Sequence, residues 1–211
     1  KVALDFGAEG IGLCRTEHMF FEEDRIHLVR QMILAKTPEE RAKPLEKLKI
    51  IQEKDFVDIF KTMGSHPVTV RLLDPPLHEF LPQENSQISE LAENFNMTSN
   101  ELKEIISSMH EINPMLGLRG CRLGVTTPEI YQMQVRAITE AAIEVSRPDK
   151  EVNVEIEIPL VGTVKELANL RKLTEDTIAE YKNKINFNYK IGTMIEVPRA
   201  CLTADKIATE A

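Results

Sequence analysis

Four charged residues follow apolar segments of this sequence, and their types suit the binding of a small anion together with a metal ion. Arg15 and Arg71 each come at the end of a short aliphatic run, and Arg119 lies in a loop that contains two glycines. A guanidinium group holds phosphate or carboxylate oxygens through paired hydrogen bonds, which a lysine cannot do. Glu196 supplies a carboxylate at the end of another apolar run. Brought together, the three arginines would hold a phosphate or carboxylate ligand.

The lone carboxylate has two interpretations, a counter-ion for the arginines or a ligand for Mg2+. Magnesium usually takes one or two carboxylates and fills its other positions with water and substrate oxygens. The metal interpretation assigns Mg2+ to Glu196 and expects a second protein ligand after Ala211. Asp74, three residues after Arg71, is expected to orient that arginine rather than to contact a substrate. A surface ion pair between the two is the plainer alternative.

The histidines and cysteines form no constellation of their own. His18 stands close to Arg15, where a supporting or packing role is expected. The sequence shows neither a serine, histidine and aspartate pattern nor a metal-ligand spacing. Its three cysteines are widely spaced without a CxxC pair, which favours reduced thiols over a disulfide framework. Cys14 and Cys201 are expected to be buried.

The composition is that of a globular domain without a nucleic-acid or membrane partner. The 211 residues are 42% hydrophobic and 28% charged, and the net charge of -8 with a pI near 5.3 argues against both kinds of partner. No apolar run approaches the length of about 18 residues that indicates a membrane span. The first residues lack the layout of a signal peptide. A cytoplasmic or organellar location is expected.

Strand and helix patterns alternate four times along the chain. Runs of β-branched and aliphatic residues predict strands, and apolar residues at helical spacing after threonine or proline starts predict helices. The expected strands cover 11–14, 68–73, 154–160 and 190–197, and the expected helices cover 1–6, 37–63 with an interruption at Pro44, 127–145, 163–181 and 198–211. The polar segment 83–112 is expected to form a helical excursion on the surface, and 113–122 a loop.

This alternation predicts an α/β fold with a parallel sheet, either doubly wound or a (β/α)8 barrel. No GxGxxG motif follows a strand, which weakens the doubly wound alternative, and charges at the strand ends favour the barrel. A complete barrel has eight strands in about 250 residues, so about four strands predict an incomplete barrel. Because helices are expected at both ends of the sequence, we expect a fragment of a longer protein.

Four stretches resemble the phosphoenolpyruvate (PEP)/pyruvate domain of the pyruvate phosphate dikinase family: Gly10–Phe21, Val68–Pro82, Asn113–Gly124 and Ile191–Ala200. They span nearly the whole chain in the order found in that family. Their Arg-Thr-Glu and Met-Ile-Glu elements are shared, more distantly, with PEP synthase and with enzyme I of the sugar phosphotransferase system. The double proline and the His-Glu-Phe-Leu-Pro sequence after Asp74 are similar to the dikinase in particular.

The resemblance implies a barrel that binds PEP and pyruvate with Mg2+ and transfers phosphoryl between pyruvate and a phosphohistidine on another domain. The overall reaction of the family converts ATP, pyruvate and phosphate to AMP, PEP and diphosphate, as a phosphotransferase with paired acceptors. Carried over by motif, Arg15 and Arg71 would hold the phosphate and carboxylate of the substrate. Arg119 would stabilise the moving phosphoryl group, and Glu196 would bind Mg2+. A homodimer is implied for the parent protein.

Much of the family's equipment lies outside residues 1–211, which are expected to form part of one barrel domain. The nucleotide-binding and phosphohistidine domains, the second Mg2+ ligand and the proton-donating cysteine are absent. No catalytic residue is therefore assigned, and the chain alone is expected to be inactive. Its open sheet edges predict self-association, with at best millimolar affinity for PEP. The alternatives are a Mg2+-dependent carbon–carbon lyase of the same barrel superfamily and a non-catalytic binding fragment.

Overall fold

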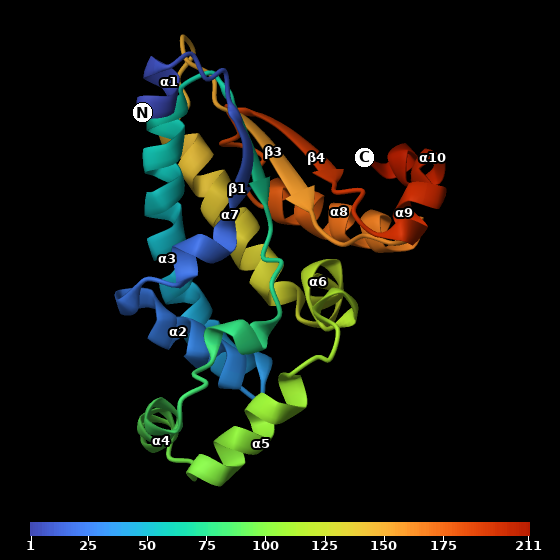
Figure 1. The fold of residues 1–211 in the computed structure, drawn as a ribbon. Helices are drawn as coiled ribbons and strands as arrows, with labels where there is room; N and C mark the ends of the chain where they lie inside the picture. Colours follow the sequence, from blue (N-terminus) through green and yellow to red (C-terminus); the bar gives the residue numbers. More distant parts are fainter.

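The computed structural model describes residues 1–211, apart from the side chain of Glu23. Its centre is a sheet of four parallel strands in the order β1-β2-β3-β4, so each strand lies beside the one that precedes it in the chain (Figure 1). Parallel neighbours require crossover connections, which the helices provide. The predicted α/β class with about four parallel strands is confirmed. The strands are β1 (Ile11–Arg15), β2 (Pro67–Arg71), β3 (Asn153–Ile158) and β4 (Asn188–Thr193).

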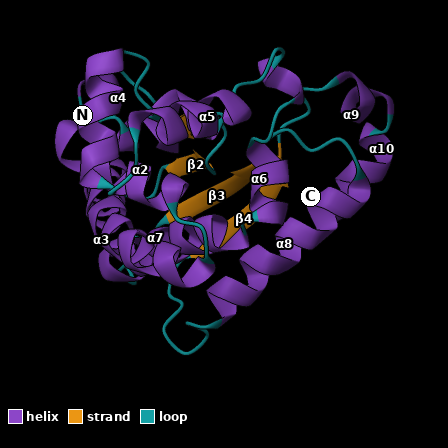
Figure 2. Ribbon diagram, turned by 90° about the horizontal axis from the view of Figure 1, so that it is seen from below, coloured by secondary structure: helices purple, strands orange, loops and turns teal.

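Helices connect the strands and cover one face of the sheet, where α7 and α8 pack side by side and α3 packs along α7 (Figure 2). α4 and α5 lie at the opposite end of the molecule from α1 (Figure 1). No helix among the described residues is long and apolar enough to cross a membrane. The helices are α1 (Val2–Asp5), α2 (Glu23–Leu34), α3 (Pro38–Met63), α4 (Asn85–Asn94), α5 (Ser99–Met109), α6 (Gly120–Thr126), α7 (Pro128–Val145), α8 (Val164–Ala179), α9 (Pro198–Leu202) and α10 (Ala204–Ile207), with 3-10 turns η1 (Thr16–Phe20), η2 (Leu77–Phe80), η3 (Pro114–Leu116) and η4 (Ala208–Glu210).

The two faces of the sheet differ in polarity because successive side chains of a strand point to opposite sides. Val70 and Ile156 belong to the face that the helices cover and are buried. The other face is polar. On it, Arg15, Arg71 and Glu157 are in register on three neighbouring strands, at or near their carboxyl ends.

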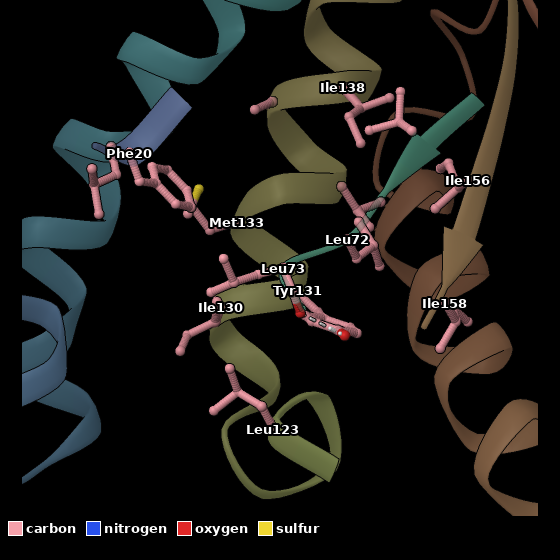
Figure 3. Packing of buried hydrophobic residues seen from close by; sticks show 14 of the residues in the cluster. Phe20, Leu72, Leu73, Leu123, Ile130, Tyr131, Met133, Ile138, Ile156 and Ile158 are labelled. Carbon is pink, nitrogen blue, oxygen red and sulfur yellow. Dashed lines mark hydrogen bonds between the residues drawn. The ribbon is translucent and has the colours of Figure 1, made fainter. Parts of the chain in front are cut away.

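The main core lies between the sheet and α7. Ile130, Tyr131 and Ile138 of α7 are fully buried. Leu72 and Leu73, directly after β2, are buried among them (Figure 3). Burying a large aliphatic side chain contributes about 1.5–3 kcal/mol. The core therefore fixes the chain where β2 ends, which is the stretch that carries the candidate site.

Pro44 does not interrupt the helix in which it lies. α3 runs from Pro38 to Met63, and Gly64 follows it with φ of 63°. A proline costs a helix interior about 3 kcal/mol, because it lacks an N–H and crowds the preceding turn. Leu48 is fully buried, and the packing of α3 offsets that cost. The predicted break is wrong because tertiary packing outweighs the local penalty.

β4 stops at Thr193, so Glu196 lies in the loop beyond the strand rather than at its end. The neighbouring β3 ends at Ile158, and Pro159 after it has no N–H to donate to a ladder. Thr193 donates its hydroxyl hydrogen to the Ile158 carbonyl oxygen at 2.7 Å, the Met194 N–H donates to the same oxygen at 3.3 Å, and the pairing of the two strands goes no farther. The predicted strand over 190–197 is too long for this reason.

The last predicted helix is divided in two. Thr203, between α9 and α10, has φ of -127° and ψ of 21°, outside the helical range. Its hydroxyl donates to the Arg199 carbonyl oxygen at 2.9 Å, a side-chain bond of the kind that competes with the helical ladder. A single helix over 198–211 is therefore wrong.

The predicted loop over 113–122 ends early, because α6 begins at Gly120. Gly120, one of the two glycines in that segment, is the first residue of α6 rather than a loop residue. Gly124 lies inside α6, where a β-carbon would come within 2.6 Å of a ring carbon of Tyr131. Glycine at this position permits the close approach of Tyr131 to α6 rather than a flexible loop.

Candidate functional site

Arg71, the last residue of β2, lies between two carboxylates. Its Nη2 donates to Glu17, and its Nη1 lies 3.2 Å from Asp74 Oδ2. The three side chains are only 5–10% exposed. Thr16 donates its hydroxyl hydrogen to the Arg71 carbonyl oxygen at 2.9 Å, which ties η1 to the end of β2. A buried ion pair of this kind is sensitive to the loss of either partner.

Asp74 joins Arg71 to Arg119. Arg119 donates from Nη2 to Asp74 Oδ2 at 2.7 Å and from Nε to the Asp74 carbonyl oxygen at 3.2 Å. Gly120, at the start of α6, donates its backbone N–H to the same carbonyl oxygen at 3.0 Å. The predicted pair of Arg71 and Asp74 is present, and it is buried rather than on the surface. The shared carboxylate holds two like-charged guanidinium groups near each other.

Arg15 and Glu196 belong to the same end of the sheet. Arg15 is the register neighbour of Arg71, and its side chain is exposed. Glu196 accepts a hydrogen bond at Oε1 from the backbone N–H of Leu160 at 2.8 Å, in the loop after β3. The structure thus places the three arginines and Glu196 at the carboxyl end of the sheet, where parallel α/β folds bind their ligands.

Two acidic residues at this end, Glu17 and Glu157, are not singled out by sequence reasoning. Glu17 meets Arg71 across 54 positions, and no local pattern indicates such a contact. Glu157 has a signal of its own. It alternates with the apolar Ile156 and Ile158, so it must point to the opposite face of the strand.

Three polar atoms of the site are buried without a hydrogen-bond partner among the described groups: Arg71 Nε, Glu17 Oε2 and Asp74 Oδ1. Buried polar atoms in native proteins are nearly always satisfied, by protein groups or by a bound molecule. Because these three belong to one linked set of side chains, their arrangement indicates that a polar ligand or water binds beside Arg71. The donor among them suits an anion.

On the polar face of the sheet, Glu157 lies near other carboxylates. With Thr69 and Glu155, Glu157 lines a hollow of about 660 Å³, and the cations Lys190 and Arg171 line the same hollow. Burial raises the pKa of Glu157, Glu155 and Glu196 raise it further, and Arg71 lowers it. The mutual effect of these carboxylates favours the binding of a cation near them.

Glu157→Gln is expected to stabilise the fold more at pH 8 than at pH 4. Folding raises the pKa of Glu157 above its ordinary value of 4.5, so ionisation of the carboxyl costs folding free energy as the pH rises through the raised pKa. Glutamine removes that cost, and solvent screening keeps the gain below about 1 kcal/mol. Urea unfolding of both proteins at the two pH values measures the difference. An equal gain at pH 4 would contradict the explanation by charge.

The carboxylates at this end of the sheet fit Mg2+ only if waters and substrate oxygens supply most of its ligands. Among the described side chains, no group of three or more His, Cys, Asp or Glu residues is placed to hold a metal ion. Magnesium does not require such a group, because one or two carboxylates suffice when waters and substrate oxygens complete its shell. Glu196, which lies near enough to Glu157 to raise the pKa of that carboxyl, meets that requirement.

Burial keeps two of the three thiols protonated. Burial, with a smaller effect of Glu17, raises the pKa of Cys14 to about 11, and burial raises that of Cys121 to about 12. Neither is a thiolate at neutral pH, so neither is a ready nucleophile. Cys201 is exposed, contrary to prediction, because the preceding Ala200 takes the buried position of α9.

Comparisons with known proteins cover the whole chain. The family described as PEP-utilising enzyme, PEP-binding domain, matches residues 1–211. Over 216 residues the chain is 50% identical to pyruvate, phosphate dikinase of Rhizobium meliloti (strain 1021). The aligned region covers 100% of the chain and 24% of that protein. The dikinase of Clostridium symbiosum is also 50% identical, covering 99% of the chain and 24% of the relative. The chloroplastic dikinase of Mesembryanthemum crystallinum is 50% identical, with shares of 99% and 23%.

The chain spans about a quarter of the length of the curated relatives it matches. The resemblance to the dikinases seen in the sequence motifs is confirmed, and with it the α/β fold of (β/α)8 barrel type, of which this chain has four parallel strands. The chain belongs to the family of PEP-utilising enzymes and corresponds to their PEP-binding domain along its whole length.

Proposed function

We propose that this chain binds PEP and pyruvate in the reaction of pyruvate, phosphate dikinase, a phosphotransferase with paired acceptors. In that reaction phosphoryl passes between pyruvate and a phosphohistidine on another domain, and ATP, pyruvate and phosphate become AMP, PEP and diphosphate. One observation carries the proposal. Asp74 links Arg71 to Arg119 at the carboxyl end of the sheet, Arg15 is the register neighbour of Arg71, and the buried Nε of Arg71 is a free donor that an anion would satisfy. The names of the relatives support it.

The arginines would divide the negative charge of PEP between them. Arg15 and Arg71 would hold its phosphate and carboxylate, and Arg119 would stabilise the phosphoryl group as it moves. Phosphoryl transfer needs mainly positioning and charge neutralisation, which fixed guanidinium groups supply. Because Glu17 and Asp74 already hold two of the arginines, little reorganisation remains when the substrate arrives.

Glu196 would hold Mg2+, with waters and substrate oxygens in the remaining positions. An ion bound there would neutralise charge that develops on the substrate. The N–H of Leu160 orients the carboxylate through Oε1 and leaves the other oxygen for the ion.

The full reaction needs partners beyond these residues. We infer the phosphohistidine and nucleotide-binding domains of the longer dikinases as those partners, in a homodimer. Residues 1–211 would form part of one barrel domain, in which 83–112, with α4 and α5, is a helical excursion. Its location would be the cytoplasm or an organelle, as for the chloroplastic relatives.

Exchange of labelled pyruvate into PEP by the natural protein that carries this sequence tests the proposal. Glu196→Gln is expected to raise the Mg2+ concentration for half-maximal exchange at least about tenfold, because a neutral amide oxygen binds the ion weakly. Glu180→Gln is the control. Glu180 forms an ordinary ion pair with Arg136 at 2.8 Å. Its replacement by glutamine is therefore expected to leave the Mg2+ requirement unchanged. Absence of exchange contradicts the function, and an unchanged requirement in Glu196→Gln contradicts the metal role.

A further inference from the structure

The segment between β2 and the Pro75-Pro76 pair carries Asp74, and its backbone is held from two directions. Leu72 donates its N–H to the Glu157 carbonyl oxygen at 3.0 Å, which continues the sheet by one residue. The two prolines that follow Asp74 have no N–H to offer a ladder. Leu73, in between, bonds to α7 instead of to a strand.

Two side chains of α7 bind both backbone polar groups of Leu73. Gln134 Oε1 accepts the Leu73 N–H at 2.8 Å, and Tyr131 donates its hydroxyl hydrogen to the Leu73 carbonyl oxygen at 3.0 Å. Figure 3 shows Tyr131 directed at the backbone of Leu73 within the apolar core. Both side chains are 0% exposed, and their spacing of three places them on one face of the helix. The two side chains thus make the two hydrogen bonds that the backbone of a neighbouring strand would otherwise make with Leu73.

Packing alone does not explain these two polar residues in the core. The Nε2 of Gln134 is buried without a partner among the described groups, which costs free energy that an aliphatic side chain would avoid. The Tyr131 ring packs closely against Gly124 of α6, so its hydroxyl has little freedom to move. Burial also holds the pKa of Tyr131 well above its ordinary value, which keeps the hydroxyl protonated as a donor.

We propose that Tyr131 and Gln134 are positioning residues for the candidate site. By fixing both backbone groups of Leu73, they set the place of the adjoining Asp74 carboxylate, and with it the spacing of the two guanidinium groups that it bridges. The inference rests on the proposed function, because it concerns the same arginines. A displacement of about 1 Å in a catalytic arrangement costs roughly 100-fold in rate.

Tyr131→Phe and Gln134→Met each remove one hydrogen bond with little change in volume. Each is expected to lower kcat of pyruvate–PEP exchange by about 10- to 100-fold and to change KM less, because the ligand still binds while the groups needed for transfer are displaced. Tyr181→Phe is the matched control and is expected to keep kcat. Its hydroxyl also has a partner, Glu140 at 2.5 Å, but that bond joins α7 to the residues after α8.

Coupling to Asp74 distinguishes positioning from general stability. In an Asp74→Asn background, Tyr131→Phe is expected to lower kcat much less than in the unsubstituted protein, because its effect passes through that carboxylate. An equal fall in both backgrounds would overturn the proposal. So would a kcat within twofold of the unsubstituted protein for both single variants.

A crystal structure of the Tyr131→Phe variant gives a measure that does not depend on activity. The distance from Arg119 Nη2 to Asp74 Oδ2, 2.7 Å here, is expected to lengthen. An unmoved Asp74 would overturn the positioning role whatever the reaction is. Failure of the proposed function is recognised separately, by an unsubstituted protein that does not exchange pyruvate with PEP.

Discussion

Arg71→Lys is expected to lower kcat/KM for pyruvate–PEP exchange by roughly 30- to 1000-fold, or about 2–4 kcal/mol of transition-state stabilisation. Arg71 contacts Glu17 and Asp74 through two different nitrogens and keeps a third, Nε, for a ligand. A lysine retains the charge but has one nitrogen on a flexible chain. Steady-state kinetics of the natural protein measure the loss.

Two further substitutions distinguish ligand binding from folding. Arg71→Met leaves Glu17 and Asp74 buried with one cation fewer, which is expected to cost about 3–5 kcal/mol of unfolding free energy. Arg136→Lys is the conservative control, because Arg136 also forms a bidentate pair, with Glu180 at 2.8 and 2.9 Å. It is expected to leave kcat/KM unchanged. Near-normal turnover in Arg71→Lys would show that Arg71 only supports the fold.

Gly120→Ala is expected to destabilise the fold by about 2–4 kcal/mol, from left-handed backbone strain and overpacking together. Gly120 has φ of +54°, and an alanine β-carbon there would lie 2.9 Å from Leu160 Cβ and 3.2 Å from Asp74 Oδ1. Leu160 has φ of 61° itself and donates its N–H to Glu196, so it has little room to move. Urea unfolding measures the loss of stability. The rate of pyruvate–PEP exchange is expected to fall as well, because Asp74 is displaced.

Gly12→Ala is the control for that change, because a β-carbon at Gly12 of β1 meets nothing within 4 Å. Its unfolding free energy is expected to stay within about 0.5 kcal/mol of the unsubstituted protein. If Gly120→Ala were as stable as Gly12→Ala, the close approach of α6 to Asp74 would not matter for the fold.

Strands and long helices follow from local patterns in the sequence. The alternation of Ile156 and Ile158 with charged residues defines a strand with one buried face, as observed. Thr98 and Thr163, each followed three residues later by a glutamate, match the pattern of a helix start, and the structure has a capping box at both. Arginines at strand ends could be identified for the same reason, since strand patterns also mark where a strand stops.

Contacts within the site do not follow from such patterns. The meeting of Arg71 with Glu17 depends on which strands are neighbours and in what register, which a hydrophobic pattern leaves open. The hydrogen bonds of Tyr131 and Gln134 to Leu73 cannot be predicted from the sequence for a different reason. Tyr131 and Gln134 occupy ordinary positions of an amphipathic helix, and only the course of the chain after β2 gives their polar atoms a role.

The sheet order has a consequence for biosynthesis. β2, β3 and β4 each pair with the strand translated just before them, so none of these three has to wait for a later strand. Ribosomes add roughly 5–20 residues per second, which leaves seconds for each intervening helix to dock. The ion pair of Arg71 with Glu17 can form soon after β2 emerges, whereas Glu196 can reach Leu160 only after β4 has emerged. On the ribosome, the strand added most recently would have an unpaired edge to which a chaperone could bind, until the next strand pairs with it.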